Sequence, residues 1–141
     1  MPIRKAKAVW NGNLKEGKGN MELESGSFKG AYSFSTRFED EKGTNPEELI
    51  AGAHAGCFSM AFSAELEKAG YKPESVETEA QVRLDKTDKG FTVTKIKLVT
   101  KGKVSDISND DFQKIANGAK EGCPISRLLT GAEIELDAKL V

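Results

Sequence analysis

The feature that most constrains the fold is a segment rich in glycine, alanine and other apolar residues that follows the Thr-Asn-Pro sequence at 44–46. Asn45 is a favourable N-cap, Pro46 suits the first helical position, and Glu48 falls where a capping-box acid belongs. Gly70 predicts the end of the helix. The residues at helical spacing are Ile50, Ala53, Cys57, Met60, Ala61 and Ala64. Since the opposite side is also small or apolar, we expect a long helix that is buried on nearly all sides.

Before this helix, the sequence predicts strands. Apolar and polar residues alternate over residues 5–10, 21–24 and 32–38, and glycines between these stretches mark turns. In the third stretch Tyr32, Phe34 and Phe38 share one face, which places Arg37 on the polar face of a strand.

After the helix, two more strands are expected around residues 76–84 and 91–98, joined by a turn at 88–90. The alternation slips near Thr94, which indicates a bulge. A second helix starts near Ser108 and breaks at Pro124, because proline disfavours a helical residue before it. Its predicted buried stripe is Phe112, Ile115, Ala116, Ala119 and Cys123. Alternation over residues 133–140 predicts a last strand.

The order of these elements predicts an α+β fold, with mostly antiparallel sheets around two main helices rather than a βαβ winding. The 141 residues fit a single domain, 1–141. With 38% hydrophobic and 30% charged residues, the composition is that of a folded, soluble chain. The longest apolar stretch, residues 49–64, contains His54 and Ser59, and we expect it to be too short to span a membrane.

Charge and cysteine content exclude several functional classes. A net charge of -1 gives no basic excess for nucleic-acid phosphates. The N-terminal residues are charged and lack the apolar core of a signal peptide, so we expect a cytoplasmic protein. Its two cysteines should then rest as thiols. Two cysteines and one histidine are too few for a closed four-ligand zinc site, so we expect no metal.

Both cysteines are open to two interpretations. They are either small buried hydrophobes or reactive thiols. Cys123 lies at a helix N-terminus if Pro124 is a first helical residue, and the helix dipole there favours a thiolate. Cys57 lies several turns inside its helix and needs a cation from elsewhere to become reactive. His54 shares the face of Cys57, but a lone histidine on an apolar face is more often a hydrogen-bonded core residue.

The segment RFEDEKGTNPEELIAGAHAGCFSM, which begins at Arg37, together with the later EGCPIS, resembles the superfamily of osmotically inducible protein C (OsmC) and organic hydroperoxide resistance proteins. The EKGTNPEEL and AHAGCFSMA sequences are closest to the OsmC branch, and the resemblance covers essentially the whole chain. It implies an OsmC-like fold and an intertwined homodimer with active sites at the subunit interface. Cys57 matches the peroxidatic cysteine and Cys123 the resolving cysteine. Arg37 matches the arginine that stabilises thiolate and peroxide, and Glu47 the glutamate that orients it.

The implied activity is reduction of organic hydroperoxides, and more weakly hydrogen peroxide, to alcohols in oxidative and osmotic stress defence. The reaction runs through a Cys57 sulfenic acid and a Cys57–Cys123 disulfide. The resemblance implies no bound cofactor, because an external dithiol restores the thiols. Candidates to line the approach of an organic peroxide are Phe58, Met60, Phe62, Leu128 and Leu129.

One distance bears on the dimer. Glu47 precedes Cys57 by ten residues, which is about 15 Å along a helix at ~1.5 Å per residue. If both serve one site, either the helix breaks between them or Glu47 comes from a second subunit. The glycine- and alanine-rich helix favours the second subunit, since two such helices could cross closely.

Other interpretations stay open. Arg37 could be an ordinary solvated arginine, and Glu47 a first-turn acid that interacts with the helix dipole. The chain could also be a non-catalytic dimeric stress or ligand-binding protein with two inert cysteines. A third class is a thiol hydrolase or acyltransferase that uses a Cys–His pair. Peroxide-dependent disulfide formation distinguishes the peroxidase from both of these alternative classes.

Overall fold

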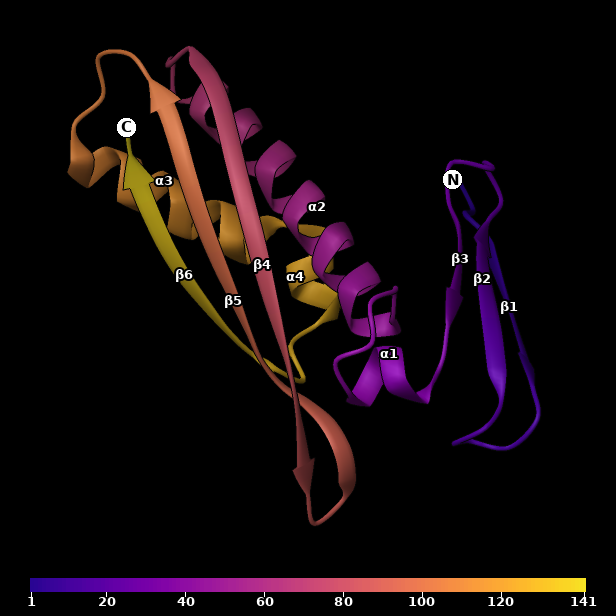
Figure 1. Cartoon of the computed structure of the whole chain (residues 1–141). Coiled ribbons are helices and arrows are strands. Elements are labelled where there is room, and N and C mark those ends of the chain that lie inside the picture. The colour runs from indigo at the N-terminus through magenta and orange to yellow at the C-terminus, as the bar shows by residue number, and fades with distance from the viewer. The chain divides into compact units, whose positions relative to one another are not determined.

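The structure is a computed structural model that describes all residues, 1–141. It is a mixed α+β fold with four helices and two three-stranded sheets (Figure 1). The contacts divide the chain into two compact units, Met1–Leu49 and Ile50–Val141. We describe each unit by itself, and the single-domain organisation stays a prediction.

The first unit contains an antiparallel sheet in the order β1-β2-β3 (Figure 1). Its strands are Ala6–Asn11, Lys18–Leu23 and Lys29–Tyr32. Trp10 and Tyr32 pack with ring centroids 5.3 Å apart, across Gly19. A Cβ at Gly19 would lie 2.5 Å from the Tyr32 ring, so the close packing of these two rings requires glycine there.

The predicted strand over residues 32–38 is wrong beyond Tyr32, because Phe34–Phe38 forms the short helix α1. Ser33 and Thr36 cap it reciprocally: the Ser33 hydroxyl accepts from the Thr36 N–H at 3.2 Å, and the Thr36 hydroxyl accepts from the Ser33 N–H at 2.8 Å. Phe34 and Phe38 are spaced by four as well as by two, and their ring centroids lie 5.0 Å apart on one helical face. Arg37 therefore lies in the last turn of a helix.

The second unit contains the sheet β4-β5-β6, with strands Pro73–Thr87, Gly90–Val104 and Glu133–Leu140. The antiparallel β4–β5 hairpin turns at Gly90, which has a φ of +101°. Arg83 pairs with Lys95 and Leu84 with Val93, so Thr94 is an extra residue in β5. The predicted bulge is confirmed at this position.

β6 pairs with β5 in parallel, whereas the other three strand pairings are antiparallel. The connection runs through α3 (Asn109–Gly122) and α4 (Pro124–Leu128), which makes this part of the chain a β-α-β crossover. Mostly antiparallel pairing is thus confirmed, but the exclusion of βαβ winding is wrong for the last strand. Alternation alone carries no information on strand direction.

Helix α2 spans Pro46–Lys68, and both of its ends lie where the sequence predicts them. The Asn45 side-chain oxygen accepts from the Glu48 N–H at 2.8 Å. Gly70 has a φ of +93°, and the Tyr71 N–H donates to the Leu66 carbonyl at 3.0 Å, as in a Schellman ending.

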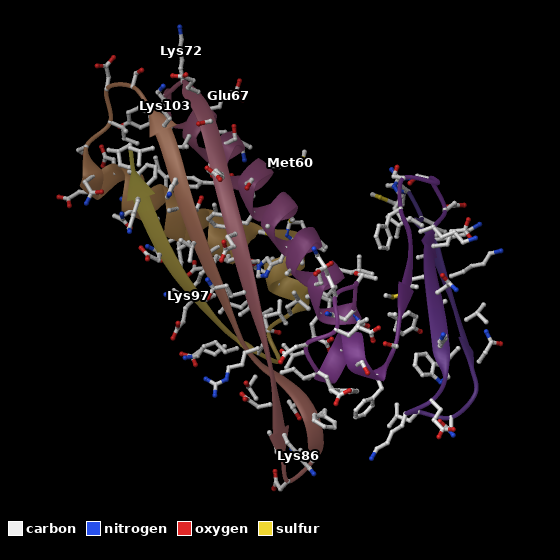
Figure 2. The ribbon with its side chains drawn as sticks, viewed as in Figure 1. Met60, Glu67, Lys72, Lys86, Lys97 and Lys103 are labelled. Carbon is white, nitrogen blue, oxygen red and sulfur yellow. The ribbon has the colours of Figure 1, made fainter.

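The expectation that α2 is buried on nearly all sides is wrong for the single chain. One stripe, spaced by four residues, is fully buried: His54, Phe58, Phe62 and Leu66. On the other side Met60 is 77% exposed and projects away from the sheet β4-β5-β6 (Figure 2). The exposed residues of that side are Gly52, Ala53, Gly56, Met60 and Ala64, which we call the small-residue face.

The apolar segment 49–64, expected to be too short to span a membrane, lies inside a longer helix. The helix extends beyond the apolar stretch at both ends to 23 residues, which by length and composition alone could cross a bilayer. The core helix of a soluble protein passes the same test.

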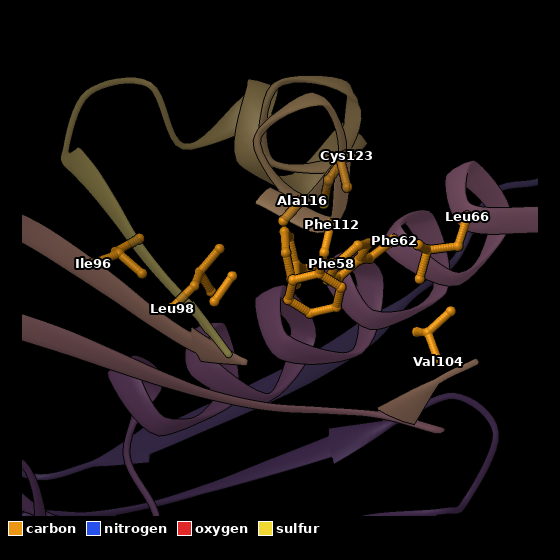
Figure 3. Close-up of a cluster of buried hydrophobic side chains, with 11 residues drawn as sticks. Phe58, Phe62, Leu66, Ile96, Leu98, Val104, Phe112, Ala116 and Cys123 are labelled. Carbon is orange, nitrogen blue, oxygen red and sulfur yellow. The ribbon is translucent and has the colours of Figure 1, made fainter. Parts of the chain in front are cut away.

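The core of the second unit lies between its sheet and the helices α2 and α3 (Figure 3). Phe62 packs between Phe58 and Phe112, with ring centroids 5.6 and 5.1 Å apart. Leu98 of β5 is fully buried in the same cluster, as is Cys123. Because the aromatic contacts hold α2 against α3, they also bring the segments that carry the two cysteines together.

Candidate active site

The two cysteines lie in contact in the second unit. The Cys57 and Cys123 Sγ atoms are 2.6 Å apart, and both residues are free thiols. Cys57 comes from the middle of α2 and is half-buried, whereas Cys123 is fully buried. The structure thus brings together the two predicted thiols from positions 66 residues apart.

Cys123 lies where α3 ends and α4 begins. Its N–H donates to the Ala119 carbonyl at 2.9 Å, and its own carbonyl accepts from the Arg127 N–H at 3.0 Å. Pro124 occupies the first position of α4, as the sequence predicts. Cys123 is therefore the N-cap residue of α4, and its sulfur lies near the unpaired N–H groups of the first turn.

The environment shifts the two thiols in opposite directions. Burial, followed by the hydrogen bond with Cys123, raises the pKa of Cys57. Burial also acts to raise the pKa of Cys123, but hydrogen bonds from the Cys57 thiol, from Ser126 and from the Ile125 N–H outweigh it and lower that pKa. Within one chain, these groups favour negative charge on Cys123, and Cys57 receives no stabilisation from a positive group.

Arg37 and Glu47 form a second pair, in the first unit. Arg37 Nε donates to both Glu47 carboxylate oxygens at 3.1 and 3.2 Å, and Nη2 donates to Oε1 at 2.8 Å. The Glu47 side chain is 11% exposed and that of Arg37 36%. The guanidinium also lies 5.1 Å from the centre of the Phe38 ring. The carboxylate fixes one edge of the guanidinium and does not occupy Nη1.

Glu47 and Cys57 both belong to α2, which is continuous from Pro46 to Lys68. Ten residues of unbroken helix separate them, or about 15 Å along the axis. Of the two explanations offered for a shared site, a break in the helix is therefore excluded.

Two buried polar residues next to the thiols were not assigned a role from the sequence. His54 is fully buried, and its Nε2 lies 2.6 Å from the hydroxyl oxygen of Ser126, which is also buried. Burial lowers the pKa of His54, so its imidazole is neutral. A possible signal was the spacing, since His54 precedes Cys57 by three residues and Ser126 follows Cys123 by three.

The predicted lining of the substrate approach needs correction. Phe58 and Phe62 are fully buried and belong to the core. Leu128 and Leu129, in contrast, line an apolar pocket of about 440 Å³ together with Val93. No group of His, Cys, Asp or Glu side chains in residues 1–141 could hold a metal ion.

The chain is similar to several known proteins. The family model described as OsmC-like protein matches residues 39–139. Peroxiredoxin OsmC of Escherichia coli strain K12 is 51% identical over 138 residues, which cover 97% of this chain and 96% of that protein. Organic hydroperoxide resistance protein OhrB of Bacillus subtilis strain 168 is 35% identical over 104 residues, or 72% of this chain and 74% of the relative.

The fold comparison also covers nearly the whole chain. The crystal structure of OhrB from Bacillus subtilis superposes with a TM-score of 0.75 at 26% identity, covering 96% of this chain and 98% of the other. An OsmC-like protein from Mycoplasma pneumoniae has the same fold, with a TM-score of 0.76 at 16% identity and coverage of 99% and 98%. The resemblance inferred from the two cysteine segments is confirmed, and the chain belongs to the OsmC-like protein family.

Proposed function

We propose that this chain is a two-cysteine peroxidase that reduces organic hydroperoxides, and more weakly hydrogen peroxide, with electrons from an external dithiol. The observation that carries the proposal is the contact between two free thiols at 2.6 Å, one half-buried and one fully buried. At 51% identity over almost the whole chain, the relationship to the Escherichia coli peroxiredoxin makes this chain a peroxidase. Organic hydroperoxides as substrates agree with the names of the more distant relatives.

Accessibility assigns the two thiol roles. Cys57 is the sulfur that a peroxide can reach, because Cys123 has no exposed surface. The Cys57 thiolate attacks the terminal peroxide oxygen, the O–O bond breaks, and an alcohol leaves once its oxygen is protonated. Cys57 becomes a sulfenic acid. Cys123 then attacks the Cys57 sulfur, which yields a disulfide and water, and a dithiol reduces the disulfide by exchange.

Ionisation of Cys57 needs a positive group, since burial raises its pKa. A guanidinium held by a buried carboxylate is suited to this task, because it stays charged and donates several hydrogen bonds. We assign it to Arg37 of a second subunit, oriented by Glu47 of that subunit. The unbroken helix between Glu47 and Cys57 supports this assignment.

The small-residue face of α2 supports a homodimer. A Cβ placed on Gly52 or Gly56 meets no atom within 4 Å, so no part of the second unit packs closely against these two glycines. Two such faces could approach closely enough for helices to cross, and Met60 would lose its exposure there. In the proposed dimer, two symmetric sites lie at the subunit interface.

The same proposal covers the reductant, the cellular compartment and the absence of a bound cofactor. The cycle requires small thiols or dithiol proteins, which the reducing cytoplasm supplies, and it needs no bound cofactor or metal. Defence against oxidative and osmotic stress is the corresponding role. The chain needs neither nucleic acid nor membrane as a partner for this reaction.

The test is turnover of cumene hydroperoxide and tert-butyl hydroperoxide with dithiothreitol. Cys57→Ser should lose at least about 1,000-fold in activity, because the nucleophile is gone. Cys123→Ser should still react once, and mass spectrometry should find an oxidised Cys57. Ser59→Ala, which removes a hydroxyl from the same helix, is the matched control and should keep its activity.

Two results would contradict the proposal. Full turnover by Cys57→Ser would remove this sulfur from the mechanism. Two thiols that stay reduced when the wild-type protein meets peroxide would leave a non-catalytic dimer or a Cys–His hydrolase instead.

A further inference from the structure

The only histidine of the chain lies in the core without a role in the reaction as described so far. It is fully buried on α2, one turn before Cys57, and contacts Ser126 of α4. Burying an imidazole removes its hydrogen bonds to water, so each ring nitrogen needs a partner inside the protein.

Only one ring nitrogen has such a partner. Nε2 lies 2.6 Å from the Ser126 hydroxyl oxygen, whereas Nδ1 is buried without a hydrogen bond. A neutral imidazole therefore leaves either an N–H group or a lone pair unsatisfied, whichever tautomer is present. A buried polar group without a partner destabilises the fold, and that cost is hard to reconcile with a purely structural histidine.

Ser126 connects the imidazole to the thiols. Ser126 is the third residue of α4, whose N-cap is Cys123, and hydrogen bonding by its backbone N–H and side chain lowers the pKa of Cys123. Its hydroxyl oxygen lies 2.6 Å from His54 Nε2, and the sulfurs of Cys123 and Cys57 lie 2.6 Å apart. The two contacts meet at the start of α4, where Cys123 and Ser126 lie one helical turn apart.

We propose that His54, acting through Ser126, is a positioning residue that accepts the thiol proton of Cys123 when Cys123 attacks the oxidised Cys57. The proposal rests on the peroxidase cycle above and concerns only its second step. In the proposed dimer Arg37 of the second subunit reverses the preference of the single chain and stabilises the Cys57 thiolate, so the proton between the two sulfurs, 2.6 Å apart, stays on Cys123. That proton must leave before Cys123 becomes a nucleophile, because the thiolate is the reactive form.

Burial explains why a relay is needed. Cys123 has no exposed surface, so water does not reach its sulfur directly. The Cys123 proton passes to the Ser126 oxygen while Ser126 gives its own proton to His54 Nε2. Because burial disfavours the charged imidazolium, His54 holds the proton only briefly.

The step balances in atoms and electrons. An electron pair of the Cys123 sulfur forms the S–S bond, and the S–O bond of the Cys57 sulfenic acid breaks with its pair on oxygen. The leaving hydroxide takes up the proton that returns from His54 through Ser126 and becomes water. The net reaction joins one sulfenic acid and one thiol into one disulfide and one water, with Cys123 oxidised and Cys57 partly reduced.

The experiment separates the two steps in time. Reduced protein is mixed with one equivalent of tert-butyl hydroperoxide and quenched with a thiol-blocking or sulfenic-acid-trapping reagent. Mass spectrometry then follows sulfenic acid and disulfide separately. His54→Gln keeps a hydrogen-bonding group near Nε2 but does not accept a proton, and Ser126→Ala removes the link.

Both variants should form the sulfenic acid at the wild-type rate and close the disulfide roughly 100-fold more slowly, the usual scale for loss of a general base. Ser59→Ala, a hydroxyl deletion on α2 outside the relay, should change neither rate. His54→Ala leaves a cavity beside Ser126, and added imidazole should partly restore its rate of disulfide formation.

Wild-type disulfide formation in folded Ser126→Ala would overturn the proposal, as would equal slowing of both steps in the two variants, which indicates a structural role. If His54→Gln does not fold by circular dichroism, Ser126→Ala alone decides. Failure of the relay is distinct from failure of the peroxidase function, because in the latter case the wild-type protein forms neither sulfenic acid nor disulfide.

Discussion

The cysteine pair and the Arg37–Glu47 pair differ in how the fold holds them. Cys57 and Cys123 are 66 residues apart in sequence and meet because aromatic core packing holds α2 against α3. Arg37 and Glu47 are ten residues apart and meet because one short helix is followed closely by the first turn of another. The first pair depends on the core of its unit, and the second on local chain geometry.

The two pairs also differ in charge. The cysteine pair consists of free thiols but receives no stabilisation from a positive group, and the ion pair has a guanidinium held by a carboxylate. A peroxidatic cysteine requires both, since a buried thiol ionises only beside a compensating charge. Each pair supplies what the other lacks, and we therefore propose that the two pairs combine across subunits.

The strongest test of this comparison removes the charge. Arg37→Gln should lower the rate of Cys57 oxidation about 100-fold, because a donor to the developing negative charge is lost. Burial then dominates and keeps the pKa of Cys57 raised, so the rate should climb about tenfold per pH unit through neutral pH. Stopped-flow kinetics with cumene hydroperoxide and the ultraviolet absorbance of the thiolate measure both effects.

Arg83→Gln is the matched control for that variant. It removes an arginine that pairs with Asp85 on exposed β4, outside both pairs, and should leave the oxidation rate unchanged. If Arg37→Gln instead oxidises at the wild-type rate with an unshifted thiolate titration, Arg37 has no part in ionising Cys57.

The second test separates the subunits. Gly56→Leu adds a large side chain to the small-residue face of α2, where the single chain offers open space. The chain should keep its fold, since leucine favours a helix over glycine by up to about 1 kcal/mol. The dimer should dissociate, and peroxidase activity should fall at least tenfold with it. Sedimentation or light scattering reports the mass of the particle.

Gly118→Leu provides the comparison for this change. Gly118 lies exposed on α3, and a Cβ there also meets no atom within 4 Å. The Gly118→Leu variant should stay dimeric and active. A monomeric wild-type protein, or a fully active monomer of Gly56→Leu, contradicts the proposed interface sites.

The sequence predicted those parts of the fold whose signals are local. The ends of α2 follow from Asn45, Pro46 and Gly70, because capping depends on neighbouring residues. The bulge at Thr94 follows from one slip in the alternation of β5. Neither the helix ends nor the bulge needs a distant contact to specify it.

The errors have equally definite causes. The spacing of Phe34 and Phe38 fits both a helix and a strand, and the reciprocal cap between Ser33 and Thr36 decides for the helix. The parallel pairing of β6 depends on the crossover through α3 and α4. Each of these outcomes depends on information that hydrophobic alternation does not contain.

The sequence predicted only part of the candidate site, for a related reason. Family resemblance identified both cysteines, Arg37 and Glu47, and the structure places them in two contacting pairs. The contact between His54 and Ser126 spans 72 residues, and their equal spacing of three from the two cysteines does not by itself predict it. Long-range contacts of this kind come from the packing of helices, which only the folded chain shows.

The smallest effect should come from the residue that orients the charge. Glu47→Gln keeps the shape of the side chain but replaces a charge-assisted pair with Arg37 by a weaker neutral contact. We expect about tenfold slower Cys57 oxidation, with the arginine present but less well held, and disulfide closure unchanged. Glu48→Gln is the matched control, because it also removes a first-turn acid of α2 but one that Thr44 contacts instead of Arg37. Equal losses in both variants would trace the effect to the helix dipole, whereas a loss confined to Glu47→Gln ties the reactivity of the buried sulfur to how firmly the guanidinium is held.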